Sequence, residues 1–213
     1  MPNSSPSLLV SYARILLHRR VGLPEGGTLP SLTHESTGLG FNRKKLARYS
    51  QVCGLTPNDN VPLLYPQVLA MPLHMRLIGD RRMPIKALGL VHIRNHVQRY
   101  RHLSADLSFD LRCRVLGHRR AKQGLEIDLG TELWSNGQLY WQGLSTYLRR
   151  GEYLPAEQVA DELPAERQWP AMTACDEASA WAVPGNAGWL FAAISGDFNP
   201  IHVSSLAARS FGF

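Results

Sequence analysis

The chain has 213 residues, of which 44% are hydrophobic and 19% charged, and its formal net charge is +6. This composition is ordinary for a globular protein and argues against a disordered chain, while no apolar run reaches the roughly 18 residues of a membrane span. Three cysteines, at positions 53, 113 and 175, show no paired spacing. They favour a reducing compartment, and we expect the cytoplasm, over a disulfide framework.

Residues 1–36 are predicted to form an N-terminal helix and a lead-in to the first domain. The first 24 residues carry three arginines and no acid, and their apolar side chains share one helical face. A surface helix docked on the domain explains this pattern. The alternative is a mitochondrial transit peptide, because such peptides are basic, amphipathic and poor in acids.

The charge is unevenly distributed along the chain. Residues 1–150 hold 21 Lys and Arg against nine Asp and Glu, a balance of +12, whereas residues 151–213 hold two against eight, a balance of −6. A basic region favours a polyanionic partner such as coenzyme A phosphates or an acidic carrier protein, or it is simply a solvated surface. No basic-aromatic motif supports a nucleic-acid partner.

Residues 37–150 read as one unit that contains a buried helix. Residues 63–78 are apolar almost all round, which is typical of a helix enclosed on most sides. Pro66 suits the first turn of this helix. Pro72 predicts a kink or a break, because proline lacks the N–H that a helix interior needs.

Alternation of apolar and polar residues predicts four strands, over residues 91–98, 107–115, 126–133 and 139–148. In the first of them Val91, Ile93 and Val97 alternate with polar residues. Asn136-Gly137 predicts a two-residue hairpin turn, because both residues tolerate positive φ. The unit is therefore expected to be one long helix followed by an antiparallel meander.

Residues 151–174 are rich in proline and acids and are predicted to be a linker. Residues 175–213 are expected to begin a second domain. Within it, residues 181–183 are candidates for the start of a sheet, and residues 188–195 for a short helix or turn that leads into the most informative stretch of the chain.

That stretch is Ser195-Gly196-Asp197-Phe198-Asn199-Pro200-Ile201-His202. Asn199 is a favourable helix N-cap and Pro200 a favourable first residue, so a helix is expected to begin there. His202 then lies in the first turn and Asp197 on the preceding loop, and their side chains converge. The positive end of the helix dipole disfavours a charged imidazolium, so His202 can act as a base.

The stretch resembles the signature of MaoC-like dehydratases and (R)-specific enoyl-CoA hydratases, which is Gly-Asp-x-Asn-Pro-aliphatic-His followed by a small residue. The matching residues are Gly196, Asp197, Asn199, Pro200, Ile201 and His202, with Ala207 beyond them. The resemblance implies an α+β hotdog fold, in which an antiparallel sheet wraps around a long buried helix. It also implies a double hotdog: residues 37–150 as the non-catalytic N-terminal unit and residues 175–213 as the start of a catalytic unit that is incomplete.

The resemblance further implies a chemistry. Asp197 and His202 would hold one water, whose oxygen adds to C3 of an enoyl thioester while a proton reaches C2; dehydration is the reverse. Asn199 would brace this pair. Gly196 lets the loop turn tightly and lets the substrate approach the backbone. No cofactor is expected, because coenzyme A enters only as part of the substrate. The N-terminal unit lacks the pair, since no histidine follows Pro62 at the start of its helix.

Basic pairs are candidates for binding coenzyme A phosphates, and Arg43, Arg81 and Arg82 are predicted as further substrate-binding residues beside Gly196. Solvated surface charge is the alternative for each. Histidines 92, 96, 102 and 118 suggest a metal site, and His92 and His96 are placed on one strand face. No cysteine or carboxylate completes a ligand pattern, so no metal is predicted.

Three functions remain open at this point. The first is hydration or dehydration of acyl-CoA or acyl-carrier thioesters. The second is a thioesterase, since one fold supports several reactions. The third is a non-catalytic acyl-CoA-binding subunit. A homodimer is expected, because hotdog units commonly pair, and neither a nucleic-acid partner nor a membrane span is predicted.

Overall fold

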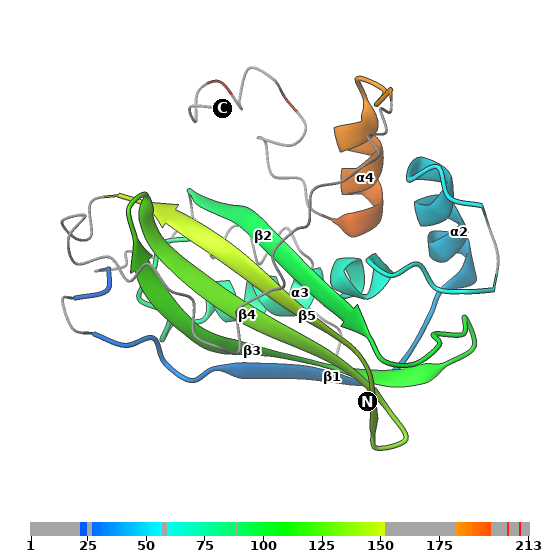
Figure 1. Ribbon diagram of the computed structural model, residues 1–213, viewed down its shortest axis with the longest axis horizontal. Coiled ribbons are helices and arrows are strands. Elements are labelled where there is room, and N and C mark those ends of the chain that lie inside the picture. Colours follow the sequence, from blue (N-terminus) through cyan, green and yellow to red (C-terminus); the bar gives the residue numbers. More distant parts are fainter. Residues whose placement is uncertain are drawn as a thin grey trace, which may run out of the picture.

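The computed structural model describes residues 22–24, 27–56, 59–87, 89–151, 182–196, 204 and 209. The strands and helices in these ranges are shown in Figure 1. In chain order they are β1 (Thr33–Gly40), α2 (Arg43–Val52), α3 (Tyr65–Gly79), β2 (Leu90–Arg99), β3 (Ser108–Ala121), β4 (Gly124–Ser135), β5 (Gln138–Arg150) and α4 (Ala187–Ser195).

The strands form one antiparallel sheet in the order β1-β3-β4-β5-β2. The strands β3, β4 and β5 are the predicted meander. The prediction was wrong for β2, which pairs with β5 at the far edge instead of with β3. The connection from β2 to β3 is pinned to the segment before α3, since Val61 donates to the Leu103 carbonyl (3.0 Å) and Ala105 to the Asp59 carbonyl (3.1 Å). The chain therefore crosses from β2, at one edge of the sheet, to β3, which lies beside the opposite edge strand β1, and passes the start of α3 on the way.

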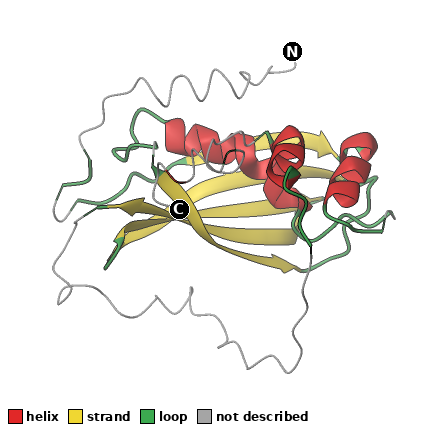
Figure 2. Ribbon diagram, turned by 90° about the horizontal axis from the view of Figure 1, so that it is seen from above, coloured by secondary structure: helices red, strands yellow, loops and turns green. Residues whose placement is uncertain are grey.

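The described helices all lie on one side of this sheet (Figure 2). The sheet curls around α3, of which no residue is exposed. Its apolar side chains join a single core with those of the central strands, among them Leu77, Leu111 and Leu129. The predicted α+β hotdog architecture is thus confirmed. Of the expected second unit only α4 and its flanks are described.

The helix α3 contains Pro66 in its first turn, as predicted, and runs without a break through Pro72. The expected break was wrong because burial outweighs the local cost of the proline. A proline inside a helix costs about 3 kcal/mol. Each fully buried apolar side chain contributes about 1.5–3 kcal/mol, and Tyr65, Leu73 and Leu77 are all nearly inaccessible to solvent.

The predicted turn at Asn136-Gly137 is confirmed. Both residues have positive φ, 48° and 72°, and they connect the paired residues Ser135 and Gln138 of β4 and β5. This is the backbone that a two-residue hairpin requires, because it matches the twist of the two strands. It fixes the register of the two central strands.

A bulge in β2, between His92 and Arg94, changes which side chains share a face. His92 pairs with Tyr147, which points to α3, whereas His96 pairs with Leu144 on the outer face. The two histidines therefore lie on opposite faces, and their placement on one face was wrong. Val91 and Val97 are separated in the same way, because the extra residue shifts the alternation by one.

The strand β1 was not among the predicted elements, and it crosses the boundary drawn between residues 36 and 37. It is a polar edge strand with a bulge at Gly38, so its alternation is weak. Leu23 and Leu32, before that boundary, are buried in the same core as α3. The packed unit therefore includes residues that precede position 37.

The core also contains a polar network around His74 on α3, which is 0% exposed. Its Nδ1 lies 3.1 Å from the Tyr147 hydroxyl and its Nε2 lies 2.7 Å from Thr131 Oγ1. Both ring nitrogens are thus satisfied by a neutral imidazole, which donates one hydrogen bond and accepts one. Burial, with a smaller contribution from His92, lowers the pKa of His74 to about 3. The ring is therefore neutral at any physiological pH.

This network predicts a pH dependence of stability. The unfolded chain protonates His74 below its ordinary pKa of 6.5, whereas the folded chain keeps it neutral until about pH 3. The stabilisation is complete above pH 6.5 and is lost as the pH falls, by about 1.4 kcal/mol per pH unit. Urea unfolding between pH 7 and pH 4 should show a shallower decline for His74→Asn than for the unmodified chain. Equal slopes would exclude this role for His74.

Candidate functional site

The helix α4 leads directly into the motif and ends in a sharp turn. Gly196 follows the helix with φ 73°, in the left-handed region, and its N–H donates to the Ala192 carbonyl at 2.8 Å. The Ser195 hydroxyl donates to the Phe191 carbonyl at 2.9 Å. A glycine is favoured here because other residues adopt positive φ at a cost. The tight turn expected at Gly196 is confirmed.

Aromatic contacts hold α4 against the N-terminal unit. The Phe191 ring lies 6.2 Å from the ring of Tyr49 on α2, and Tyr49 lies 5.0 Å from Tyr65 in the first turn of α3. Ala192 on α4 is 1% exposed. The start of the motif is thereby positioned by α2 and by the beginning of the buried helix.

The predicted catalytic residues Asp197, Asn199 and His202 lie outside the described residues. Their convergence on one water stays a prediction. Of the proposed site, the structure places Gly196 and the helix that carries it.

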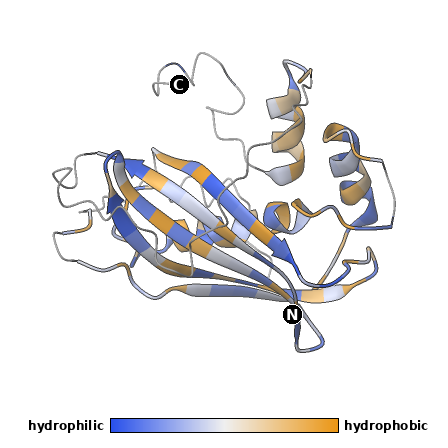
Figure 3. Cartoon of the chain, in the orientation of Figure 1, coloured by the Kyte–Doolittle hydropathy of each residue, from blue (hydrophilic) through white to orange (hydrophobic). Residues whose placement is uncertain are grey.

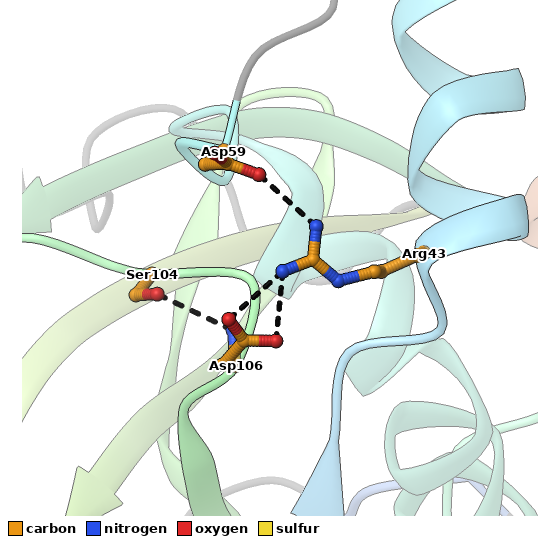
Figure 4. A network of polar contacts seen from close by, with 4 residues as sticks. All are labelled: Arg43, Asp59, Ser104 and Asp106. Carbon is orange, nitrogen blue, oxygen red and sulfur yellow. Dashed lines mark hydrogen bonds and ion pairs between the residues drawn. The ribbon is translucent and has the colours of Figure 1, made fainter.

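Arg43, the first residue of α2, lies in an ion-pair cluster (Figure 4). Its guanidinium contacts Asp59 at 3.0 Å and both oxygens of Asp106 at 2.8 Å. The backbone N–H of Asp106 donates to Ser104 Oγ at 3.3 Å. Hydrogen bonds to Asp106 and then to Asp59 raise the pKa of Arg43. Two carboxylates thus surround one guanidinium, which makes the cluster a clamp between α2 and the loops beside α3 and disfavours a phosphate there.

Arg82 is also engaged by an acid. Its Nε and Nη2 donate to the two oxygens of Asp80 at 3.0 and 2.9 Å, and hydrogen bonding to Arg82 is the main reason that the pKa of Asp80 falls to about 2. Arg81 is exposed. These two arginines follow the end of α3, whereas Arg43 lies beside its start. Fifteen helical residues span about 22 Å. The structure therefore does not bring the three arginines together.

Among the described residues a histidine and an aspartate also meet at the end of α3, where His34 Nε2 lies 3.7 Å from Asp80 Oδ2. Burial is the main cause of the lowered pKa of His34. Asp80 is already held by Arg82, which weakens it as a base. We therefore do not assign acid-base chemistry to this pair.

Arg119 and Arg120, a further basic pair, make contacts within the protein. Arg119 and Arg94 both pair with Glu126 on the outer face of the sheet, and Arg120 donates to the Pro24 carbonyl at 3.3 Å. Within the described ranges no group of three or more His, Cys, Asp or Glu side chains is arranged to hold a metal ion. No helix in the described part of the chain is long and apolar enough to cross a membrane.

Two features were missed by the sequence analysis. One is the pair Gln67 and His74 on the largely apolar helix α3. These polar residues are seven positions apart, and this spacing of two turns indicates a shared buried face. Gln67 donates to Ser145 Oγ at 3.0 Å. The other is Arg48, which extends the basic pair Lys44-Lys45 at a spacing of one helical turn.

Comparison with known proteins shows what the chain is similar to. Over 216 aligned residues the chain is 29% identical to 3-hydroxyacyl-thioester dehydratase X of Mycobacterium tuberculosis, covering 99% of this chain and 73% of that protein. The crystal structure of HtdX from the same organism matches with a TM-score of 0.68 and 27% identity, over 85% of this chain and 68% of that one.

A MaoC-like dehydratase from Phytophthora capsici shows the same fold, with a TM-score of 0.64 and 19% identity over 86% of this chain and 68% of that one. No family model matches the chain. The hotdog sheet, the buried helix and the similarity to HtdX agree with one another. The chain is therefore similar in sequence to a 3-hydroxyacyl-thioester dehydratase and in fold to MaoC-like dehydratases.

The packing of α4 on α2 gives a testable prediction. Tyr49→Ala removes the ring that touches both Phe191 and Tyr65 and should lower the free energy of unfolding by about 3 kcal/mol, as for other large-to-small core changes. Amide hydrogen exchange in α4 should accelerate more than exchange in β4. The neighbouring exposed Arg48→Ala is the control and should change stability by less than about 0.5 kcal/mol. Unchanged exchange in α4 would show that Tyr49 does not hold this helix.

Proposed function

We propose that the protein is a hydro-lyase that removes water from 3-hydroxyacyl thioesters, or adds it to the corresponding enoyl thioesters. The observation that carries this proposal is the similarity, over 99% of the chain, to 3-hydroxyacyl-thioester dehydratase X. The stretch from Gly196 to His202 supports it, because this segment of the chain carries an acid and a base at the spacing that such a reaction needs.

In the proposed mechanism Asp197 and His202 orient one water. For hydration, the water oxygen forms a bond to C3 of the enoyl thioester as the water gives up a proton, and C2 receives a proton. The C2–C3 double bond becomes a single bond, so atoms and electrons balance without an oxidant. Negative charge develops on the thioester oxygen during the reaction, and N–H donors stabilise it. Each such donor typically raises the rate by a factor on the order of 10²–10³.

The N-terminal unit acts as a scaffold in this proposal. Its only histidine on α3, His74, is fully buried and neutral, and Asp59 at the start of that helix is paired with Arg43. Neither group is disposed to activate water. What the unit supplies is the surface formed by α2 and α3, on which α4 and hence Gly196 are seated.

Further properties are proposed with the function. Coenzyme A takes part only as a portion of the substrate, and the reaction requires no cofactor. The protein acts as a homodimer in the cytoplasm, with the mitochondrion as the alternative if the basic N-terminus serves as a transit peptide. These proposals rest on the sequence patterns described above.

The function is tested by hydration of crotonyl-CoA, followed as loss of the absorbance of its conjugated double bond. Asp197→Asn and His202→Gln should each lower kcat by about 10²–10⁴-fold, the usual contribution of a positioned acid or base. Asp161→Asn, the same change within the predicted linker, is the matched control and should keep full activity. Full activity in Asp197→Asn would contradict the assigned pair. Release of free thiol without hydration would instead identify a thioesterase.

A further inference from the structure

The exposed face of α2 carries a stripe of three cations, Lys44, Lys45 and Arg48, which we call the α2 stripe. The helix contains no acidic residue, and all three side chains are exposed. Their spacing of one, three and four residues places them on one side of the helix, within a single turn. Within the described part of the chain, none of the three side chains makes a hydrogen bond or ion pair. The stripe is therefore a patch of positive charge without internal compensation.

Other arginines of the described part differ from the α2 stripe in this respect. Six of them form ion pairs with acids of the same unit: Arg43, Arg82, Arg94, Arg112, Arg114 and Arg119. The sheet thus neutralises much of its own charge. Charge on α2 remains available to an outside partner, and a patch of one sign attracts oppositely charged molecules over a distance.

We propose that the α2 stripe docks an acidic carrier protein that presents the acyl thioester to the motif; this rests on the proposed function. The location of the α2 stripe supports this proposal. The helix that bears the stripe contacts α4 through Tyr49 and Phe191, and α4 leads straight into the motif at Gly196. A carrier seated on α2 would lie next to α4, the helix that ends at Gly196. Figure 3 shows the contrast between the polar side of α2 and the apolar α4 beside it.

The surroundings of the stripe fit a protein partner. Leu55 follows α2 and is 43% exposed, and Leu64, just before Tyr65, is 49% exposed. Tyr65 itself contacts Tyr49 of α2. Exposed apolar side chains after α2 and at the start of α3, together with a row of cations on α2, are features that a protein interface uses, because its centre is apolar and its rim is polar. The clamp of Arg43 on Asp59 and Asp106 holds this surface in place before docking.

The same geometry disfavours a binding site for the free phosphates of coenzyme A. A phosphate at a helix start uses unpaired backbone N–H groups. On α2 the side chain of Asn42 already accepts the N–H of Lys45, at 3.0 Å, and Arg43 is engaged by two carboxylates. The three cations of the stripe are exposed side chains of one helix, so they suit long-range attraction of an extended acidic face better than enclosure of one phosphate.

The test compares two substrates that share an acyl group. The charge-reversed variant Lys44→Glu/Lys45→Glu/Arg48→Glu should lose at least tenfold in kcat/KM for crotonyl-loaded bacterial acyl carrier protein, mainly through KM. Its kcat/KM for crotonyl-CoA should stay within about twofold. The matched control is Lys86→Glu/Arg99→Glu/Lys122→Glu, which reverses three exposed cations elsewhere and should keep both activities. An equal loss with both substrates would point to coenzyme A phosphates and overturn the proposal, as would no loss with either.

Binding of the unacylated carrier protein, measured by calorimetry, separates this proposal from the proposed function. The unmodified chain and the control variant should bind it, with an affinity that falls as salt rises, and the stripe variant should bind at least tenfold more weakly. Equal binding by all three overturns the docking surface. Selective binding without hydration of crotonyl-CoA would contradict the proposed function and leave the docking surface standing. Matching urea unfolding curves establish that the variants are folded.

Discussion

Enclosure of α3 by the sheet is the constraint on which the rest of the structure depends. The helix has no exposed residue, so its polar side chains must find partners inside the protein. His74 does so through Tyr147 and Thr131, on the two central strands. These contacts fix the rotation and depth of the helix relative to β4 and β5. They also explain how a helix with an internal proline stays continuous, because every turn is held from outside.

The beginning of α3 is where the other elements converge. Tyr65 contacts Tyr49 of α2, and through it α4 is tied to the unit. The loop that crosses from β2 to β3 is hydrogen-bonded to the same region, and Arg43 joins that loop to α2. A small number of aromatic and ionic contacts thus places Gly196 relative to the core. The far end of α3, with Asp80 and Arg82, takes no part in this arrangement.

Local signals in the sequence were sufficient for the helix, the hairpin and the central strands, because these elements are decided by period and by turn chemistry. Local signals did not predict the order of the strands, since the pairing of β2 with β5 depends on contacts between residues some fifty positions apart. The bulge in β2 reversed the faces of Val97 and His96 without any glycine or proline to announce it. For the site, Gly196 and its turn followed from sequence. The pairing of Arg43 and Arg82 did not, because it depends on carboxylates brought near by folding.

The two histidines that the fold and the motif single out illustrate how position on a helix decides chemistry. His74 lies in the middle of α3, without contact with water, and its pKa of about 3 leaves it unable to accept a proton near neutral pH. A general base needs both access to the proton and a pKa near the working pH. The motif, by its Asn199-Pro200 start, is predicted to put His202 in the first turn, where a helix meets solvent and ligand. The chain is therefore predicted to use His74 to hold the core of its N-terminal unit and His202, in the second unit, to move protons.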